Sequence, residues 1–187
     1  FAHKHNHLMQ LCGENIECKY LMPVLLNFDG DCLILLRRNL LAVAPQEGCA
    51  LLIGDQQLTK DFHKKWLWNV RMIWPCCNAW DHRLINNSGS FNDKTLKNLR
   101  RLSKETGFAV DPREQIHAQR WARNQNFRVL GSAHSHPNGK MTPSLLDLDL
   151  SNSQGIMVII SNSGKVNGWW TKKDRSTHKL KVTNFSC

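Results

Sequence analysis

No apolar run in this 187-residue sequence reaches the roughly 18 residues that a membrane-spanning helix needs. The best candidate, CLILLRRNLLAVA, is interrupted by Arg37 and Arg38. The opening FAHKHNHLMQ lacks the apolar segment of a secretory signal. The seven cysteines are odd in number and have no regular spacing, so they do not form the pattern of a disulfide framework. These absences predict a protein of the reducing cytoplasm that has no membrane partner.

Acidic residues are also scarce, since 15 Asp and Glu stand against 25 Lys and Arg and the formal charge is +10. An excess of this size permits acidic partners or nucleic acid. Much of it lies in two segments, KTLKNLRRLSK (94–104) and KKDRSTHKLK (172–181). Neither is a recognised binding motif, so we interpret the charge as a solvated cationic surface.

The length favours one domain, which would bury roughly 70% of the surface that its unfolded chain exposes. Residues 1–19 are polar and contain HKHNH, and we interpret them as a disordered N-terminal extension. Residues 20–187 then form a single domain. Within it, residues 79–107 change to a loop-like and basic sequence, which indicates an insertion between core elements.

Apolar periodicity predicts strands and helices in the first half of the domain. We expect a strand over 20–28, a helix over 32–43 and a strand over 49–54 that ends at Gly54. Asp29 or Asp31 would cap this helix. The apolar face of the helix would consist of Leu33, Leu36, Leu40 and Val43.

A fourth element has the period-two pattern of a strand. Its large apolar residues are Trp66, Trp68, Val70, Met72 and Trp74. Tryptophans interleaved with Lys and Arg can form a stacking platform for single-stranded nucleic acid. We favour one buried strand face, because alternation is what a sheet requires.

The second half begins with a clear helix start, in which Asp111 is the N-cap, Pro112 is the first helical residue and Glu114 completes a capping box. This helix should run to about residue 125. A strand over 127–137, a helix from Ser144 and a hairpin formed by GIMVIIS and KVNGWWTKK follow. The resulting order predicts an α/β domain with one mixed β-sheet flanked by helices.

The stretch HSHPNGKMTPSLLD (134–147) carries the most specific chemistry. Side chains alternate along a strand, so His134 and His136 point the same way and Ser135 points opposite. On a helix that begins at Ser144, Asp147 shares the face of Ser144. If the loop folds back, His134, His136 and Asp147 converge and leave one coordination position open. Three such ligands plus water are the arrangement of a catalytic zinc site.

Each half of this pattern has a simpler interpretation. Ser-x-x-Asp at a helix start is also a capping box, with Ser144 as the N-cap. A lone His-x-His is often a pair of surface histidines. The compact combination of both pairs, where a strand end meets a helix start, nevertheless favours a metal site.

His134-Ser135-His136, seven residues, then Ser144-x-x-Asp147 resembles the signature of the JAMM (MPN-type) zinc metallopeptidases. Three further stretches are similar to the compact bacterial form of that family over about residues 22–172: LLAVAPQEGCALLIG (40–54), FAVDPREQ (108–115) and VLGSAHSHP (129–137). The resemblance implies a cytidine-deaminase-like fold. It also implies bound Zn²⁺ held by His134, His136 and Asp147.

By the same resemblance, Glu47 takes the place of the family's glutamate and acts as the general base for the zinc-activated water. Ser144 would donate a hydrogen bond to the oxyanion of the tetrahedral intermediate. Without the resemblance, Glu47 would be interpreted as a surface residue after a helix. Ser135 should contact backbone, Asp149 should face outward, and Asp111 should serve as a cap.

Deaminase activity is disfavoured, because the Pro-Cys-x-x-Cys half of that signature is absent. The leading hypothesis is a zinc peptidase or isopeptidase that cleaves at the C-terminal tail of a ubiquitin-like or sulfur-carrier protein. A non-catalytic MPN-type interaction scaffold is the alternative, although this chain keeps all the ligands. Nucleic-acid association ranks third, because the basic segments lie away from the motif. The sequence does not indicate an oligomeric state.

Overall fold

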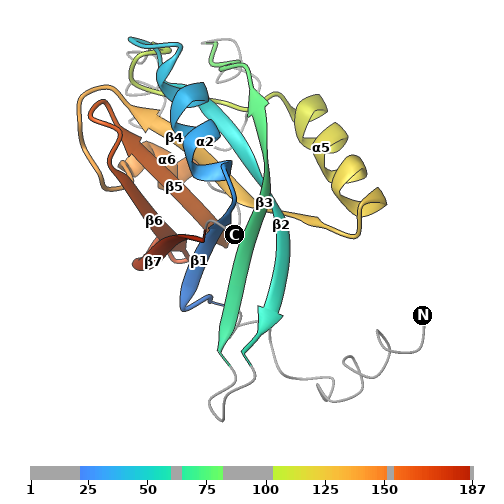
Figure 1. Cartoon of the computed structure of the whole chain (residues 1–187). Helices are drawn as coiled ribbons and strands as arrows, with labels where there is room; N and C mark the ends of the chain where they lie inside the picture. The colour runs from blue at the N-terminus through green and yellow to red at the C-terminus, as the bar shows by residue number, and fades with distance from the viewer. Residues whose placement is uncertain (1–21, 60–64, 82–102, 151–153, 186–187) are drawn as a thin grey trace.

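The computed structural model describes residues 22–59, 65–81, 103–150 and 154–185 (Figure 1). Seven strands and three helices lie in these ranges, in the order β1 (Leu25–Asp29), α2 (Cys32–Leu41), β2 (Cys49–Leu58), β3 (Trp66–Cys76), α5 (Pro112–Asn124), β4 (Arg128–His136), α6 (Leu145–Leu150), β5 (Gly155–Ser161), β6 (Val166–Thr171) and β7 (Thr177–Phe185). The proposed extension 1–19 and most of the proposed insertion 79–107 lie outside the described residues. Among the described residues, no helix is both long and apolar enough to cross a membrane.

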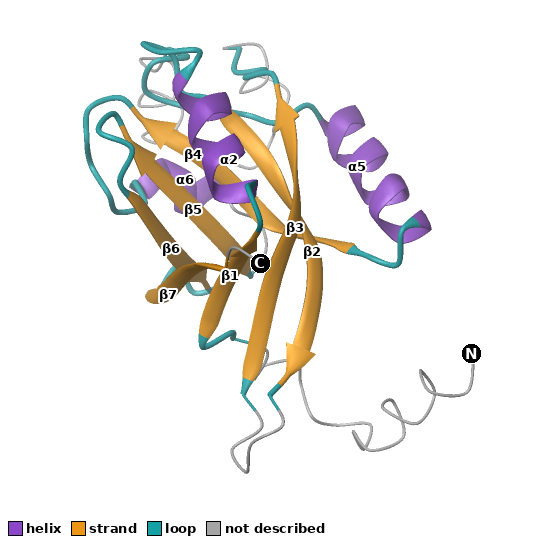
Figure 2. Ribbon diagram, in the orientation of Figure 1, coloured by secondary structure: helices purple, strands orange, loops and turns teal. Residues whose placement is uncertain are grey.

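The strands form one sheet that closes on itself in the order β1-β3-β2-β4-β5-β6-β7 (Figure 2). The sheet is mixed: β1 pairs in parallel with β3 and β7, β4 pairs in parallel with β5, and the other pairs are antiparallel. The predicted mixed sheet with helices is therefore confirmed, but as a closed barrel. The likeness to cytidine deaminases stays a prediction.

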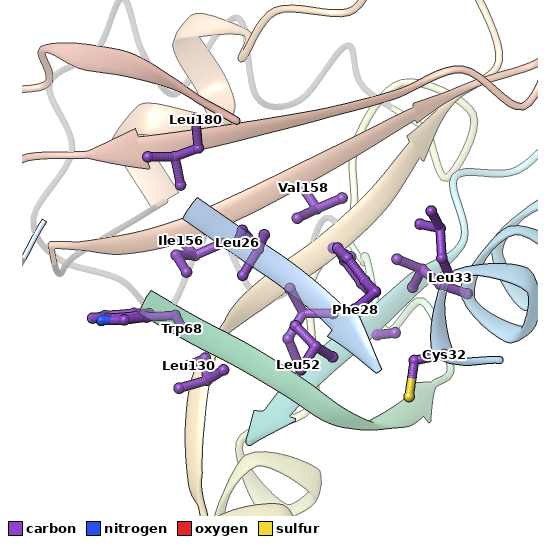
Figure 3. Close-up of a cluster of buried hydrophobic side chains, with 14 of the residues drawn as sticks. Leu26, Phe28, Cys32, Leu33, Leu52, Trp68, Leu130, Ile156, Val158 and Leu180 are labelled. Atoms are coloured by element: carbon purple, nitrogen blue, oxygen red, sulfur yellow. The ribbon is translucent and has the colours of Figure 1, made fainter. Parts of the chain in front are cut away.

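The main core fills the inside of this barrel and extends to α2 (Figure 3). Leu26 and Phe28 of β1 and Leu52 of β2 are fully buried there. On α2, Leu33, Leu36 and Leu40 recur at the spacing of one helix face and are buried as predicted.

A second core lies on the opposite face of β2 and β4, under α5. Leu51 and Ile53 pack there against Ala118 and Ala122 of the helix. Small residues at the contact let α5 lie close to the sheet, which Figure 1 shows on the side away from α2. Strand β2 thus has apolar residues on both faces, as a strand between two cores requires.

The single buried face predicted for β3 is wrong beyond Val70. Ile53 pairs with Met72 while Gly54 pairs with Val70, so Arg71 is an extra residue in this strand. Such a bulge reverses the alternation. Trp68 and Val70 therefore face the main core, whereas Met72 belongs to the second core.

Arg71 itself is held by ion pairs to Asp29 at 2.8 Å and Asp55 at 2.7 Å. Asp29 therefore does not cap α2. Asp31 occupies the N-cap position, but its side chain makes no capping hydrogen bond.

Several predicted boundaries also need correction. Strand β2 does not end at Gly54, because the strand accommodates Gly54 next to the bulge and continues to Leu58. Helix α2 ends at Leu41, which leaves Val43 47% exposed instead of on the buried face. Strand β1 begins only at Leu25.

Asp111 caps α5 as predicted and accepts a hydrogen bond from the Arg113 backbone at 2.8 Å. The other half of the predicted capping box is not the bond that the structure gives Glu114. Its carboxylate instead accepts a hydrogen bond from the Trp74 indole at 3.0 Å. The predicted hairpin of β5 and β6 is confirmed. Strand β7 is an addition to the predicted elements, and its first half lies in the basic segment 172–181.

Candidate metal centre

Three buried side chains converge where β4 ends and α6 begins. The Nε2 atoms of His134 and His136 lie 2.9 Å apart. They lie 3.5 and 3.4 Å, respectively, from Oδ2 of Asp147. The exposed fractions of His134, His136 and Asp147 are only 0%, 4% and 5%. The structure therefore brings together the three residues that the sequence predicted as ligands.

These donors fit a zinc ion. A tetrahedral ion with ligands about 2.0–2.1 Å away separates its ligand atoms by about 3.3–3.4 Å. The two distances from the histidines to Asp147 are close to this value, and the distance of 2.9 Å between the histidines is shorter. Two imidazole nitrogens and one carboxylate oxygen form a donor set that zinc accepts. Among the described residues, this is the group of His, Cys, Asp and Glu side chains whose donor atoms, all within 4.8 Å of one another, could hold a metal ion.

Strand β4 aims the two histidines by simple alternation. Ser135 points the opposite way, as predicted, and its Oγ accepts a hydrogen bond from Gly48 N at 2.8 Å and donates to Leu40 O at 3.2 Å. This hydroxyl ties the end of β4 to the end of α2 and to the start of β2. The direction of both imidazoles therefore follows from backbone contacts on the far side of the strand.

The loop between β4 and α6 orients His136. Its Nδ1 lies 3.0 Å from the carbonyl oxygen of Lys140, which leaves Nε2 to face the other ligands. The next carbonyl, that of Met141, accepts hydrogen bonds from Asn167 and Trp169 of β6 at 3.1 and 3.0 Å. Outer contacts of this kind fix the ring orientation of metal-binding histidines.

Both interpretations of Ser-x-x-Asp hold at the start of α6. Ser144 Oγ accepts from Asp147 N at 3.1 Å, and Asp147 Oδ2 accepts from Ser144 N at 2.7 Å. The reciprocal capping box holds the carboxylate in place while the same oxygen faces the histidines. Asp149 is not part of the cluster and instead pairs with Arg175 at 2.8 Å.

The protonation preferences of His134 and Asp147 suit a cation. Burial lowers the pKa of His134 and so favours the neutral imidazole that binds metals. Burial alone would raise the pKa of Asp147, but hydrogen bonds with His134 and His136 outweigh it and hold that pKa well below its usual range. For His136, the interactions with Asp147 outweigh burial and raise the pKa.

Glu47 lies beside this cluster and is not a surface residue. It is 2% exposed, and its Oε2 has no hydrogen-bond partner among the described residues. Burial raises its pKa to about 8, with His136 opposing and Asp147 reinforcing the shift. The position follows from strand register, because Cys49 of β2 pairs with His134 of β4 and Glu47 precedes that pair by two residues.

Sequence reasoning missed two residues around the site. The Phe108 ring stacks on the His134 ring, with centroids 4.3 Å apart and planes inclined by 23°. The Asn78 side chain hydrogen-bonds the backbone of Glu47. Neither residue has a spacing signal, because both reach the site through loops.

Comparisons with known proteins bear on the family and on the fold. The family described as prokaryotic homologs of the JAB domain matches residues 31–172. A solution structure from Desulfitobacterium hafniense has a TM-score of 0.62 at 21% identity, covering 87% of this chain and 94% of that one. One from Salinibacter ruber has a TM-score of 0.51 at 21% identity, with coverages of 85% and 91%.

A crystal structure of a JAB1/MPN domain protein from Archaeoglobus fulgidus is also similar, with a TM-score of 0.41 at 16% identity and coverages of 84% and 96%. No curated protein matches the chain. At these identities, the solution structures bear on the fold alone.

Proposed function

Since this chain belongs to the family of prokaryotic homologs of the JAB domain, we propose that it is a zinc-dependent peptidase or isopeptidase. The observation that supports the proposal is the convergence of His134, His136 and Asp147 beside the buried carboxylate of Glu47. A scaffold has no need to bury a carboxylate whose Oε2 finds no hydrogen-bond partner in the described part of the chain. Burial without a partner is costly for such a group, and chemistry is a reason to retain it.

His134, His136 and Asp147 would hold the ion. When bound, zinc lowers the pKa of a water ligand to about 7 and so supplies a nucleophile at neutral pH. Glu47 Oε2 accepts the proton of the attacking water and later delivers one to the leaving amine. The backbone around Glu47 is held by hydrogen bonds, so the carboxylate does not need to reorganise during the reaction.

Ser144 serves the oxyanion of the tetrahedral intermediate. Its Oγ already accepts from Asp147 N, which leaves the hydroxyl proton to donate. Ser144 is exposed, and Leu145 next to it is 82% exposed, so a substrate can reach both. The substrate class that we propose is the extended C-terminal tail of a ubiquitin-like or sulfur-carrier protein.

The test uses zinc-loaded protein and a ubiquitin-like carrier that bears extra residues after its terminal Gly-Gly. We expect cleavage at that junction, detected by intact mass spectrometry, and a loss of about 10²- to 10⁴-fold in rate for Glu47→Gln. Asp31→Asn, which removes an exposed carboxylate at the start of α2, is the control and should cleave like the wild type. Absence of cleavage, or equal rates for Glu47→Gln and the wild type, would refute the proposal.

A further inference from the structure

The Asn78 side chain, just after β3, lies within hydrogen-bond distance of five backbone atoms. The two N–H groups of its Nδ2 donate to the carbonyl oxygens of Glu47 and Gly107, both at 3.0 Å, and Lys104 O at 3.3 Å shares one of them. Its Oδ1 accepts from the backbone N–H of Trp80 at 2.9 Å and of Ala109 at 3.2 Å. Carbonyls surround the amide nitrogen and N–H groups surround the oxygen, so the orientation of the amide is determined by its neighbours.

These bonds join Glu47, which lies two residues before β2, to a segment that we call the 103–109 segment. The segment also meets Glu47 directly, since Glu47 N donates to Lys104 O at 2.7 Å. It is tied to the end of β3 by Ala79 N, which donates to Ala109 O at 2.9 Å. The backbone N–H of Glu47 is therefore held by the 103–109 segment, and its carbonyl oxygen is held by the Asn78 side chain that binds the same segment.

The same segment reaches one metal ligand and the helix that carries another. Phe108 stacks on the His134 ring. A Cβ added at Gly107 would lie 3.2 Å from the Leu146 side chain, so the segment also packs closely against α6, next to Asp147. One amide thus organises the backbone that carries Glu47 and the loop that contacts both His134 and α6.

From this arrangement we propose that Asn78 is a positioning residue, which sets where the Glu47 carboxylate stands relative to the metal ligands. The inference rests on the proposed peptidase function. It requires a side-chain amide, because an amide offers both the donors for the carbonyls and the acceptor for the two N–H groups. Aspartate has the same shape but lacks the donors.

The experiment compares Asn78→Ala and Asn78→Asp with Asn69→Ala. Asn69 is a buried asparagine in the sheet that bonds Asp55 and Asn27, away from the site, so its variant controls for general destabilisation. A displacement of about 1 Å at a catalytic group costs about 10²-fold in rate. We expect kcat to fall about 10- to 100-fold in both Asn78 variants, and to stay within about twofold in Asn69→Ala.

Two readouts separate positioning from loss of structure. Zinc affinity, measured by competition with a chelator, should change less than about threefold in the Asn78 variants, because the ligands themselves remain. In the Glu47→Gln background, Asn78→Ala should cause almost no further loss of kcat, because residues that act as a unit are not additive. Two results would overturn the inference. One is that Asn78→Ala lowers kcat by the same factor in the wild type and in the Glu47→Gln background, and the other is that Asn78→Ala leaves the kcat of the wild type unchanged.

Amide hydrogen exchange makes the test independent of turnover. The N–H groups of Glu47, Trp80 and Ala109 should exchange at least about tenfold faster in Asn78→Ala but not in Asn69→Ala. If the wild type cleaves no substrate, the proposed peptidase function fails, and these exchange rates alone decide about Asn78. Unchanged exchange at all three amides would overturn the positioning role.

Discussion

Replacing Glu47 by Gln in the metal-free protein tests the state of the buried carboxylate through unfolding instead of catalysis. The side chain is 2% exposed and its pKa is raised from 4.5 to about 8, mainly by burial. Between these two values the folded protein keeps the proton of Glu47 while the unfolded chain has released it. The folded state then binds more protons, so the stability of the wild type falls as pH rises through this window.

The size of the effect follows from the shift. Each pH unit within the window costs the wild type about 1.4 kcal/mol, so the change from pH 5 to pH 8 amounts to at most about 4 kcal/mol. Glutamine does not titrate. We therefore expect Glu47→Gln to differ little from the wild type near pH 5 and to become progressively more stable than the wild type toward pH 8.

Urea unfolding of metal-stripped protein at four pH values between 5 and 8 measures this difference. Glu105→Gln corrects for the loss of one negative charge from an exposed position. Zinc should shrink the difference at pH 8, because a nearby dication favours the ionised carboxylate. If the stability difference is the same at every pH, Glu47 ionises like a surface residue and the argument from burial is refuted.

Three further outcomes follow from the same contacts. Asp147→Asn should lower zinc affinity more than about 100-fold, because loss of a ligand costs more than loss of an outer-shell partner. Metal analysis that finds one zinc per chain in this variant would contradict the prediction. Ser135→Ala strands the buried Gly48 N–H, so urea unfolding should show a loss of about 1–3 kcal/mol with zinc stoichiometry unchanged; an unchanged midpoint would count against the Ser135 contacts. Gly54→Ala places a Cβ 1.8 Å from a carbonyl oxygen of β3 and should cost more than about 3 kcal/mol, so a wild-type Tm would show that the two strands are farther apart than described.

The metal ligands were predictable because their geometry is local. His134 and His136 need only the alternation of a strand, and Asp147 needs only the first turn of a helix. One short loop joins the two elements. The capping box and the ligand set proved compatible, since the box holds the carboxylate that the ligand set uses.

Glu47 was beyond any local pattern. Its neighbourhood depends on the pairing of β2 with β4, and the bond that pins this pairing joins Gly48 to Ser135 across 87 residues. Register between distant strands is set by the whole sheet, so only the family resemblance identified this residue. Asn78 lay outside both sources of information. Phe108 opens the family-like stretch FAVDPREQ (108–115), but neither source gave it a role.

The errors in the fold have physical causes as well. The alternation of β3 predicted one buried face, but a single bulged residue at Arg71 gives the strand two. In β7, the buried Leu180 lies between the exposed Lys179 and Lys181. The strand was missed because these charged residues make its sequence look like a basic surface segment. The missed strand is also the reason that closure of the sheet was not foreseen.

Strand β7 joins the two ends of the sheet, since it pairs with β6 on one side and with β1 on the other. A chain cut before Thr177 would keep every proposed zinc ligand yet leave two rows of unsatisfied backbone groups, one on β1 and one on β6. Such rows recruit other strands and promote aggregation. Anyone shortening this protein for expression should therefore expect precipitation from a truncation that does not touch the chemistry.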